Sequence, residues 1–226
     1  MLERFKVPDE IAVHVDFQDM HIAVTQIFIA LGSPKDDAVR CANTLMYTDV
    51  RGIDSHGVSN MMRFYVDGIR SGGINPSPTW SIVRESAAVA TIDCDRGLGL
   101  TIGPVAMDLA IEKARECGIG SVVATNGRHF GAAAFHAHRA IEHDMIGISM
   151  TVGGLQVAPT FASKPLVGLN PLAVAAPSKS QPPFVFDASM SSVAGNKIRL
   201  ARRLGVNILP GWIGTGEGVP IMEEQP

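Results

Sequence analysis

Two histidines occupy glycine-flanked turns, and each turn directly precedes a segment with the pattern of a helix. His56 lies in the stretch RGIDSHG at 51–57, and His129 lies in NGRHFG at 126–131. The amino terminus of a helix carries unpaired amide donors and a positive potential, which attract anions and disfavour a charged imidazole. A ring placed there gives up its proton readily near neutral pH. We therefore predict that Ser55 caps the following helix and that His56 acts as an acid beside anion-binding amides.

Two other interpretations of these histidines stay open. Each histidine taken alone fits a capping or surface residue, and only the repetition of the setting favours a catalytic role. Ser55 and His56 are adjacent, but no GxSxG elbow accompanies them, as many serine hydrolases require. The turn therefore favours acid–base chemistry over nucleophilic catalysis.

A carboxylate is the third candidate group. Asp187 ends the apolar strand pattern FVFD, and the serine-rich stretch ASMSS follows it. A carboxylate at the end of a strand can orient an imidazole, and the serines beyond it can hydrogen-bond a phosphate or a ribose. An aspartate that caps a helix before a polar loop explains the same residues equally well.

The remaining histidines predict no metal site. His136 and His138 lie two apart in a predicted helix, so their rings point about 200° apart and cannot share a metal ion. We expect both residues, and also His143, to lie on the surface. The sequence contains no HExxH motif or cysteine cluster, so we predict no bound metal.

The glycine-rich stretch DCDRGLGLTIG at 93–103 has some features of a dinucleotide fingerprint. It follows a predicted strand and opens a predicted helix, but its third glycine falls at GxGxxxG. The next strand ends in ATN at 124–126, without an acid for a ribose hydroxyl. We interpret the stretch as a turn whose glycines allow close helix packing.

The segments that must position these groups alternate between helix and strand patterns. The third helix shows the clearest apolar stripe, and Ser33 and Pro34 predict the start of the second. Helices are predicted at 15–31, 34–48, 56–70, 104–117, 130–143 and 191–203, and strands at 81–83, 88–93, 120–125, 145–152, 172–176 and 184–187. This alternation predicts an α/β fold with partly parallel pairing, divided near residue 76 into a helical region at 1–76 and an α/β region at 77–226.

Composition excludes several classes of protein. The chain has 226 residues, 46% hydrophobic content and a net charge of −3, so a globular core is expected and a nucleic-acid binder is not. It contains no apolar run long enough for a membrane span and no secretion signal at its amino terminus, which predicts a cytoplasmic protein. Its cysteines, Cys41, Cys94 and Cys117, are far apart in the sequence, so we expect buried, reduced thiols.

Four segments together resemble the second type of the malate/L-lactate dehydrogenase family: RGIDSHG, NGRHFG, GLNPLA at 168–173 and FDASMS at 186–191. That family includes ureidoglycolate, sulfolactate and diketogulonate oxidoreductases and cyclic imino acid reductases. The resemblance implies a helical N-terminal substrate and catalytic region packed on a mixed-sheet, non-Rossmann cofactor-binding domain. It also implies NAD or NADP as cofactor, a small 2-oxo, 2-hydroxy or cyclic imino acid as substrate, and a homodimer.

The resemblance also assigns roles to residues of this chain. Ser55 and His56 match the family's Ser-His pair, with the histidine as proton donor in reduction, and Asp187 matches the acid that completes the relay. His129 matches a histidine implicated in catalysis or nicotinamide contact. The cofactor is expected along Thr151, Gly153, Asn170, Pro171, Asp187, Ala188 and Ser189.

This sequence departs from the family pattern at two places. Relatives commonly carry an arginine four residues after the first histidine, where this chain has Asn60. Arg63 lies on the same helix and is our candidate to pair with the substrate carboxylate in its place. Family members also continue beyond the point where this sequence stops. We therefore keep a shortened, catalytically silent binding or assembly relative as the alternative to an active oxidoreductase.

Overall fold

Three helices form the N-terminal part of the structure, a computed structural model that describes residues 3–226. They are α1 (Phe17–Ala30), α2 (Lys35–Asp49) and α3 (Val58–Arg70). The apolar stripe predicted for the third helix is confirmed, because Met61 and Tyr65 are buried against α1 and α2 in the largest core cluster. The predicted start of the second helix is wrong by one residue: Pro34 is the residue before the helix, and Ser33 does not cap it.

The first sheet holds three strands and a long connecting helix. Strand β1 (Ser81–Glu85) pairs antiparallel with β2 (Val89–Asp93), which pairs parallel with β3 (Ser121–Thr125). Helix α4 (Gly99–Cys117) joins the two parallel strands. The predicted partly parallel pairing is therefore confirmed for this sheet.

Helix α4 begins well before Pro104, the predicted start. A proline inside a helix leaves the carbonyl four residues earlier without its usual donor. Here that carbonyl belongs to Leu100, and the hydroxyl of Thr44 donates to it at 3.3 Å. The same hydroxyl hydrogen is shared with Arg40 O, which lies at 2.9 Å, so Thr44 replaces the missing donor in part and ties α2 to α4.

Close packing explains the glycines at the start of α4. A Cβ atom on Gly99 would lie 2.2 Å from Phe130 Cβ, and one on Gly103 would lie 2.4 Å from His136 Cε1. The interpretation of the stretch at 93–103 as a helix-packing turn agrees with this geometry. The predicted surface position of His136 is wrong: the ring is 2% exposed, and its Nε2 donates to the carbonyl of Phe130 at 2.7 Å. The ring fills the space that Gly103 leaves open.

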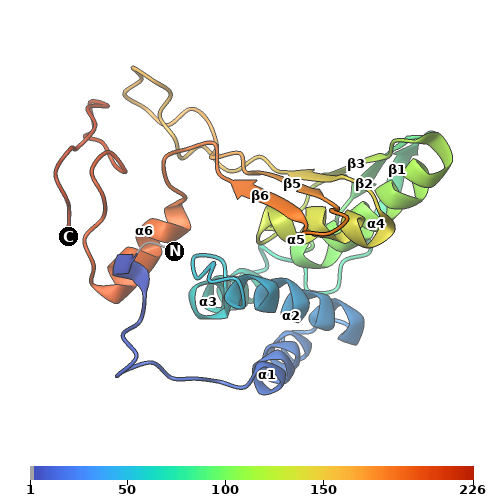
Figure 1. The fold of residues 1–226 in the computed structure, drawn as a ribbon, viewed down its shortest axis with the longest axis horizontal. Helices are drawn as coiled ribbons and strands as arrows, with labels where there is room; N and C mark the ends of the chain where they lie inside the picture. The colour runs from blue at the N-terminus through green and yellow to red at the C-terminus, as the bar shows by residue number, and fades with distance from the viewer. Residues whose placement is uncertain (1–2) are drawn as a thin grey trace.

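The second sheet is entirely antiparallel. It consists of β4 (Gly147–Met150), β5 (Leu172–Ala176) and β6 (Phe184–Ala188), with β5 in the centre. Helix α5 (Ala133–His138) and the 3-10 helix η2 (Arg139–His143) cover one face, where the alanines of α5 and Ile141 of η2 pack on the alanines of β5. The predicted helix at 130–143 is therefore split into two shorter pieces. Figure 1 shows this sheet above α2 and α3.

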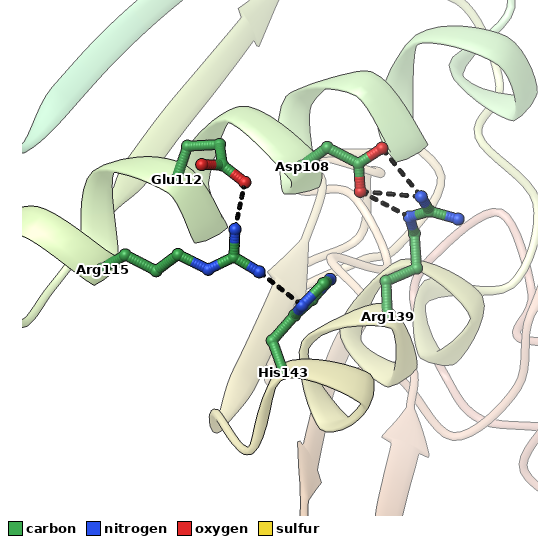
Figure 2. A network of polar contacts seen from close by, with 5 residues as sticks. All are labelled: Asp108, Glu112, Arg115, Arg139 and His143. Atoms are coloured by element: carbon green, nitrogen blue, oxygen red, sulfur yellow. Dashed lines mark hydrogen bonds and ion pairs between the residues drawn. The ribbon is translucent and has the colours of Figure 1, made fainter.

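Charged side chains hold η2 to α4. Arg139 donates to both carboxylate oxygens of Asp108 at 2.7 Å, and Arg115 bridges Glu112 and His143 at 2.7 Å each (Figure 2). His143 is exposed here, as predicted. These contacts hold η2, which covers one face of the second sheet, against α4.

The last helix, α6 (Gly195–Leu204), packs beside α3 and against the short N-terminal helix η1 (Glu3–Phe5), as Figure 1 shows. Phe5, Leu200 and Ile208 form a small separate core there. The division of the chain near residue 76 stays a prediction. No helix within residues 3–226 is long and apolar enough to cross a membrane.

The cysteines divide into two groups. Cys41 and Cys94 are buried, as predicted, and burial raises the pKa of the Cys94 thiol to about 11. Cys117 is exposed, so the prediction that all three are buried is wrong. It is the last residue of α4, at the end that leads away from the core. All three thiols are free.

Candidate active site

The turn between α2 and α3 is fixed by hydrogen bonds to the end of α2. The amide of Ile53 donates to Thr48 O at 2.9 Å, and the Thr48 hydroxyl is shared between Leu45 O at 2.6 Å and His56 O at 3.2 Å. The first amide of α3, that of Val58, donates to the Asp49 carboxylate at 3.1 Å. The predicted cap Ser55 is therefore wrong, because an aspartate of the preceding helix takes that role.

A glycine makes this cap possible. A Cβ atom on Gly57 would lie 1.7 Å from Asp49 Oδ1. We expect Gly57→Ala to displace the carboxylate and to lower the free energy of unfolding by about 1–3 kcal/mol, measured by urea denaturation. Gly73→Ala is the control, because a Cβ atom there meets nothing closer than 3.5 Å. Equal stability of the two variants would contradict this explanation of the turn.

The two glycine-flanked turns meet in the folded chain. The rings of His56 and His129 are stacked, with centroids 5.6 Å apart and planes 12° apart. Phe64 of α3 lies edge-on to His129 at 5.9 Å. The residues predicted from the two turns thus form one site.

The partners of His56 indicate its tautomer. Ser55 Oγ lies 2.9 Å from Nδ1, and the side-chain amide nitrogen of Asn196 lies 3.4 Å from Nε2. Because that amide nitrogen is a donor, Nε2 accepts and Nδ1 carries the hydrogen that it donates to Ser55. The ring therefore presents a basic nitrogen at Nε2.

Both rings are held neutral at physiological pH. Burial lowers the pKa of His56 to about 4, and the nearby Lys197 adds to the effect. Burial lowers the pKa of His129 to about 3, with further contributions from His56 and Arg199. The low proton affinity predicted for His56 therefore has a different cause: burial first and Lys197 of α6 second, rather than the end of α3.

Asp187 does not join the pair directly. Its carboxylate accepts a hydrogen bond from the amide of Ala134 at 2.8 Å, at the start of α5, and burial raises its pKa. Within residues 3–226 no hydrogen bond links it to His56. The predicted relay is not formed in this chain because strand β6 faces α5, and Ser55 occupies the ring nitrogen that Asp187 would need.

Of the two predicted substrate-binding residues, Arg63 points to solvent and Asn60 makes hydrogen bonds that hold the backbone. The Arg63 side chain is 94% exposed and lies 3.8 Å from Asp67 on the same helix, so the structure does not bring it to the site. Asn60 is buried and donates to Ser55 O at 2.9 Å and to Asn196 O at 3.2 Å. It fixes the turn and α6 against each other.

A cavity of about 250 Å³ opens beside Ser55, between the turn and α6. It contains two cationic side chains, Arg51 and Lys197, that the sequence analysis did not single out. The cavity is lined by Phe5, Arg51, Gly52, Ile53, Asp54, Ser55, Lys197 and Leu200. Arg51 and Lys197 outnumber the one carboxylate of the lining, Asp54, so the cavity can attract a small anion beside Ser55.

The predicted cofactor residues gather at one end of the second sheet. Met150, Leu172 and Ala188 are paired across the three strands. The residues just beyond them are also connected, because the amide of Thr151 donates to Pro171 O at 3.3 Å. Gly153 packs closely on Gly168, and Asn170 has a left-handed backbone with φ 39°. The structure therefore brings seven predicted cofactor residues to this end of the sheet, which we call the sheet edge below: Thr151, Gly153, Asn170, Pro171, Asp187, Ala188 and Ser189.

Comparison with known proteins identifies the family. Residues 15–225 match the model of the malate/L-lactate dehydrogenase family. This chain belongs to that family. The resemblance inferred from the four sequence segments and the predicted mixed α/β fold are thereby confirmed.

Three relatives show the range of similarity. A malate dehydrogenase of Pyrococcus abyssi is 44% identical over 210 residues, which is 93% of this chain and 58% of the relative. An L-sulfolactate dehydrogenase of Methanocaldococcus jannaschii is 36% identical, over 87% of this chain and 57% of its own length. The solved malate dehydrogenase of Pyrococcus horikoshii superposes with a TM-score of 0.82 at 41% identity, over 86% of this chain and 55% of that structure. The chain thus spans a little under three fifths of these relatives.

Proposed function

We propose that this protein is an NAD- or NADP-dependent oxidoreductase that interconverts a small 2-hydroxy acid and its 2-oxo acid, or an amino acid and its cyclic imine. The stacked pair of His56 and His129 carries the proposal. Two neutral imidazoles, close to a cavity that Arg51, Lys197 and Asp54 line, can bind an anionic substrate and move a proton at its oxygen or nitrogen. The names of relatives, malate dehydrogenase, sulfolactate dehydrogenase and pyrroline-2-carboxylate reductase, agree with this substrate class.

His56 is the proposed acid–base group. In the oxidation direction its unprotonated Nε2 accepts the proton of the substrate hydroxyl, and in reduction the protonated ring returns it. Ser55 holds Nδ1, so the ring keeps its orientation in both directions. When bound, nicotinamide accepts or supplies the hydride at C2 of the substrate.

The substrate carboxylate is proposed to pair with Lys197 and Arg51 in the cavity beside Ser55, in place of Arg63. Lys197 is near enough to His56 to lower its pKa, which places a cation next to the reacting group. Asn60 supports this arrangement by fixing Ser55 and α6. We also propose a cytoplasmic homodimer, as the family resemblance implies.

The residues at the edge of the second sheet fit the cofactor. Hydroxyl and amide groups such as those of Thr151, Asn170 and Ser189 suit ribose and diphosphate oxygens, and the close packing of Gly153 on Gly168 holds the two loops together. Asp187 lies between this edge and the segment that carries His129, because it binds the start of α5. We propose that it links cofactor binding to the position of that segment.

The second candidate is a catalytically silent binding or assembly module of the same family. The observation that favours it is the exposed apolar surface of the second sheet, where Ile148, Met150, Phe184 and Phe186 are each more than 40% exposed. Such a surface is typical of a contact with another polypeptide. This candidate predicts that neither reduced cofactor binds.

Calorimetric titration with NADH and NADPH separates the two candidates. We expect one of them to bind with micromolar affinity. A panel of 2-oxo acids and cyclic imines, followed by the loss of reduced nicotinamide absorbance, then identifies the substrate. Absence of binding by both cofactors would contradict the proposed oxidoreductase.

A further inference from the structure

The second histidine of the pair has its own set of partners. His129 Nδ1 lies 2.8 Å from the hydroxyl of Tyr65 on α3 and 3.3 Å from the backbone nitrogen of Gly131. Tyr65 comes from a helix 64 residues earlier in the chain. Its ring is completely buried beneath the histidine pair and packs against Phe28 and Phe64. Nδ1 therefore faces protein groups rather than a substrate.

Two independent arguments determine the tautomer of His129. The amide of Gly131 is a donor only, so a hydrogen on Nδ1 would point at another hydrogen. The Tyr65 hydroxyl is buried, and within residues 3–226 its hydrogen has no other acceptor than Nδ1. If Nδ1 donated instead, that buried hydrogen would be left without a partner, which is unfavourable. Both arguments place the ring hydrogen on Nε2.

Tyr65 cannot become an acceptor for a hydrogen on His129 Nδ1 by losing its own proton. Burial raises the pKa of its phenol well above the usual value, so the hydroxyl keeps its hydrogen. A second proton on His129 would have to enter at Nδ1, between two donors. Burial, the neighbouring His56 ring and the positive charge of Arg199 also oppose it, because all three lower the pKa of His129.

We propose that Tyr65 and the Gly131 amide lock His129 as a neutral imidazole whose only free group is an Nε2–H donor. This assigns different roles to the stacked histidines, within the proposed function. His56 presents a basic Nε2 that exchanges a proton, whereas His129 presents a fixed donor that can stabilise negative charge on the substrate oxygen. A neutral imidazole held as a hydrogen-bond donor is a known way to polarise a carbonyl. Tyr65 is thus a positioning residue that acts through His129.

The tautomer can be measured without enzymatic activity. In protein with ¹⁵N-labelled histidine, a long-range proton–nitrogen spectrum distinguishes protonated from unprotonated ring nitrogens, and a His129→Asn variant identifies the signals of this ring. We expect a neutral His129 with Nε2–H, unchanged down to about pH 5. A spectrum with the hydrogen on Nδ1, or a charged ring near neutral pH, would overturn the proposal.

Tyr65→Phe tests the source of the lock. It removes one hydroxyl and keeps the ring, so we expect a mixture of His129 tautomers and a higher pKa for that ring. Tyr47→Phe is the matched control, because the Tyr47 hydroxyl is also buried but has no partner in the described residues. Equal His129 spectra in the two variants would refute the role of Tyr65. If Tyr65→Phe does not fold, the wild-type spectrum still decides the tautomer.

The effect on turnover is a separate readout. If the proposed function holds, Tyr65→Phe should lower kcat on the order of 10-fold and leave the affinity for reduced cofactor unchanged, whereas Tyr47→Phe should change neither. An unaltered kcat together with a disordered His129 tautomer would refute the donor role. Failure of the wild-type protein to turn over any substrate would count against the proposed function, while the spectra would still decide the lock.

Discussion

Replacement of His56 by asparagine should lower kcat on the order of 10²- to 10⁴-fold, the usual contribution of a positioned acid–base group. The asparagine can still hydrogen-bond to Ser55, but it cannot exchange a proton with the substrate. Cofactor affinity should be unchanged, because the proposed cofactor residues lie at the edge of the second sheet. Steady-state kinetics and calorimetry on the same preparation measure the two effects.

His143→Asn is the matched control for that variant. His143 is exposed and bound to Arg115, in the network between η2 and α4. Its substitution removes a histidine without touching the stacked pair, so kcat should stay at the wild-type value. A His56→Asn protein as active as this control would remove His56 from the proposed role.

Acidification should destabilise the protein through its buried histidines. Burial lowers the pKa of His136 to about 4 in the folded chain, against 6.5 for an unperturbed histidine. Between these values the unfolded chain binds the proton and the folded chain does not, so stability falls as the pH falls. Between about pH 7.5 and about pH 5, His136 alone should lower the free energy of unfolding by roughly 2 kcal/mol. His56 and His129 act in the same direction.

Two carboxyl groups act in the opposite direction. Burial raises the pKa of Asp49 and of Asp187, so their folded forms take up protons before the unfolded chain does. As the pH falls, this proton uptake by the folded chain offsets part of the destabilisation that the histidines cause. Urea denaturation at several pH values should therefore show a loss of stability that begins near pH 6.5.

A non-titrating replacement isolates the contribution of His136. His136→Gln keeps an N–H group for the carbonyl of Phe130, and it should reduce the slope of stability against pH by about 1.4 kcal/mol per unit. An equal slope in the wild-type and His136→Gln proteins would show that the buried ring is charged in the folded state.

Local patterns of apolar residues predicted the helices and strands well. The stripe of the third helix gave the burial of Met61 and Tyr65, because helical periodicity is a property of neighbouring residues. The burial of His136 also had a signal, since Ala133, Ala137 and Ala140 mark a buried face and His136 lies on it. The surface position predicted for His136 is wrong because its place on the buried face outweighs the polarity of its ring.

The site could be predicted only in part. Its two turns were found because glycine and histidine recur before a helix, and the structure stacks the two rings. The partners of those rings, Asn196 and Tyr65, come from distant helices, and nothing in their local sequence marks them. Arg63 is expected at the site from its helical position, but in the structure it is exposed beside Asp67, so nothing draws its side chain inward.

Transfer of deuterium from C2 of a labelled 2-hydroxy acid to the nicotinamide ring tests the central claim most directly. The wild-type protein, with the oxidised form of the cofactor that it binds, should move the label to C4 of the nicotinamide for at least one acid of the malate, lactate or sulfolactate type. His56→Asn should move it at least on the order of 10²-fold more slowly. Label that stays on every acid while the cofactor is bound, or transfer at the same rate in both proteins, would contradict the account.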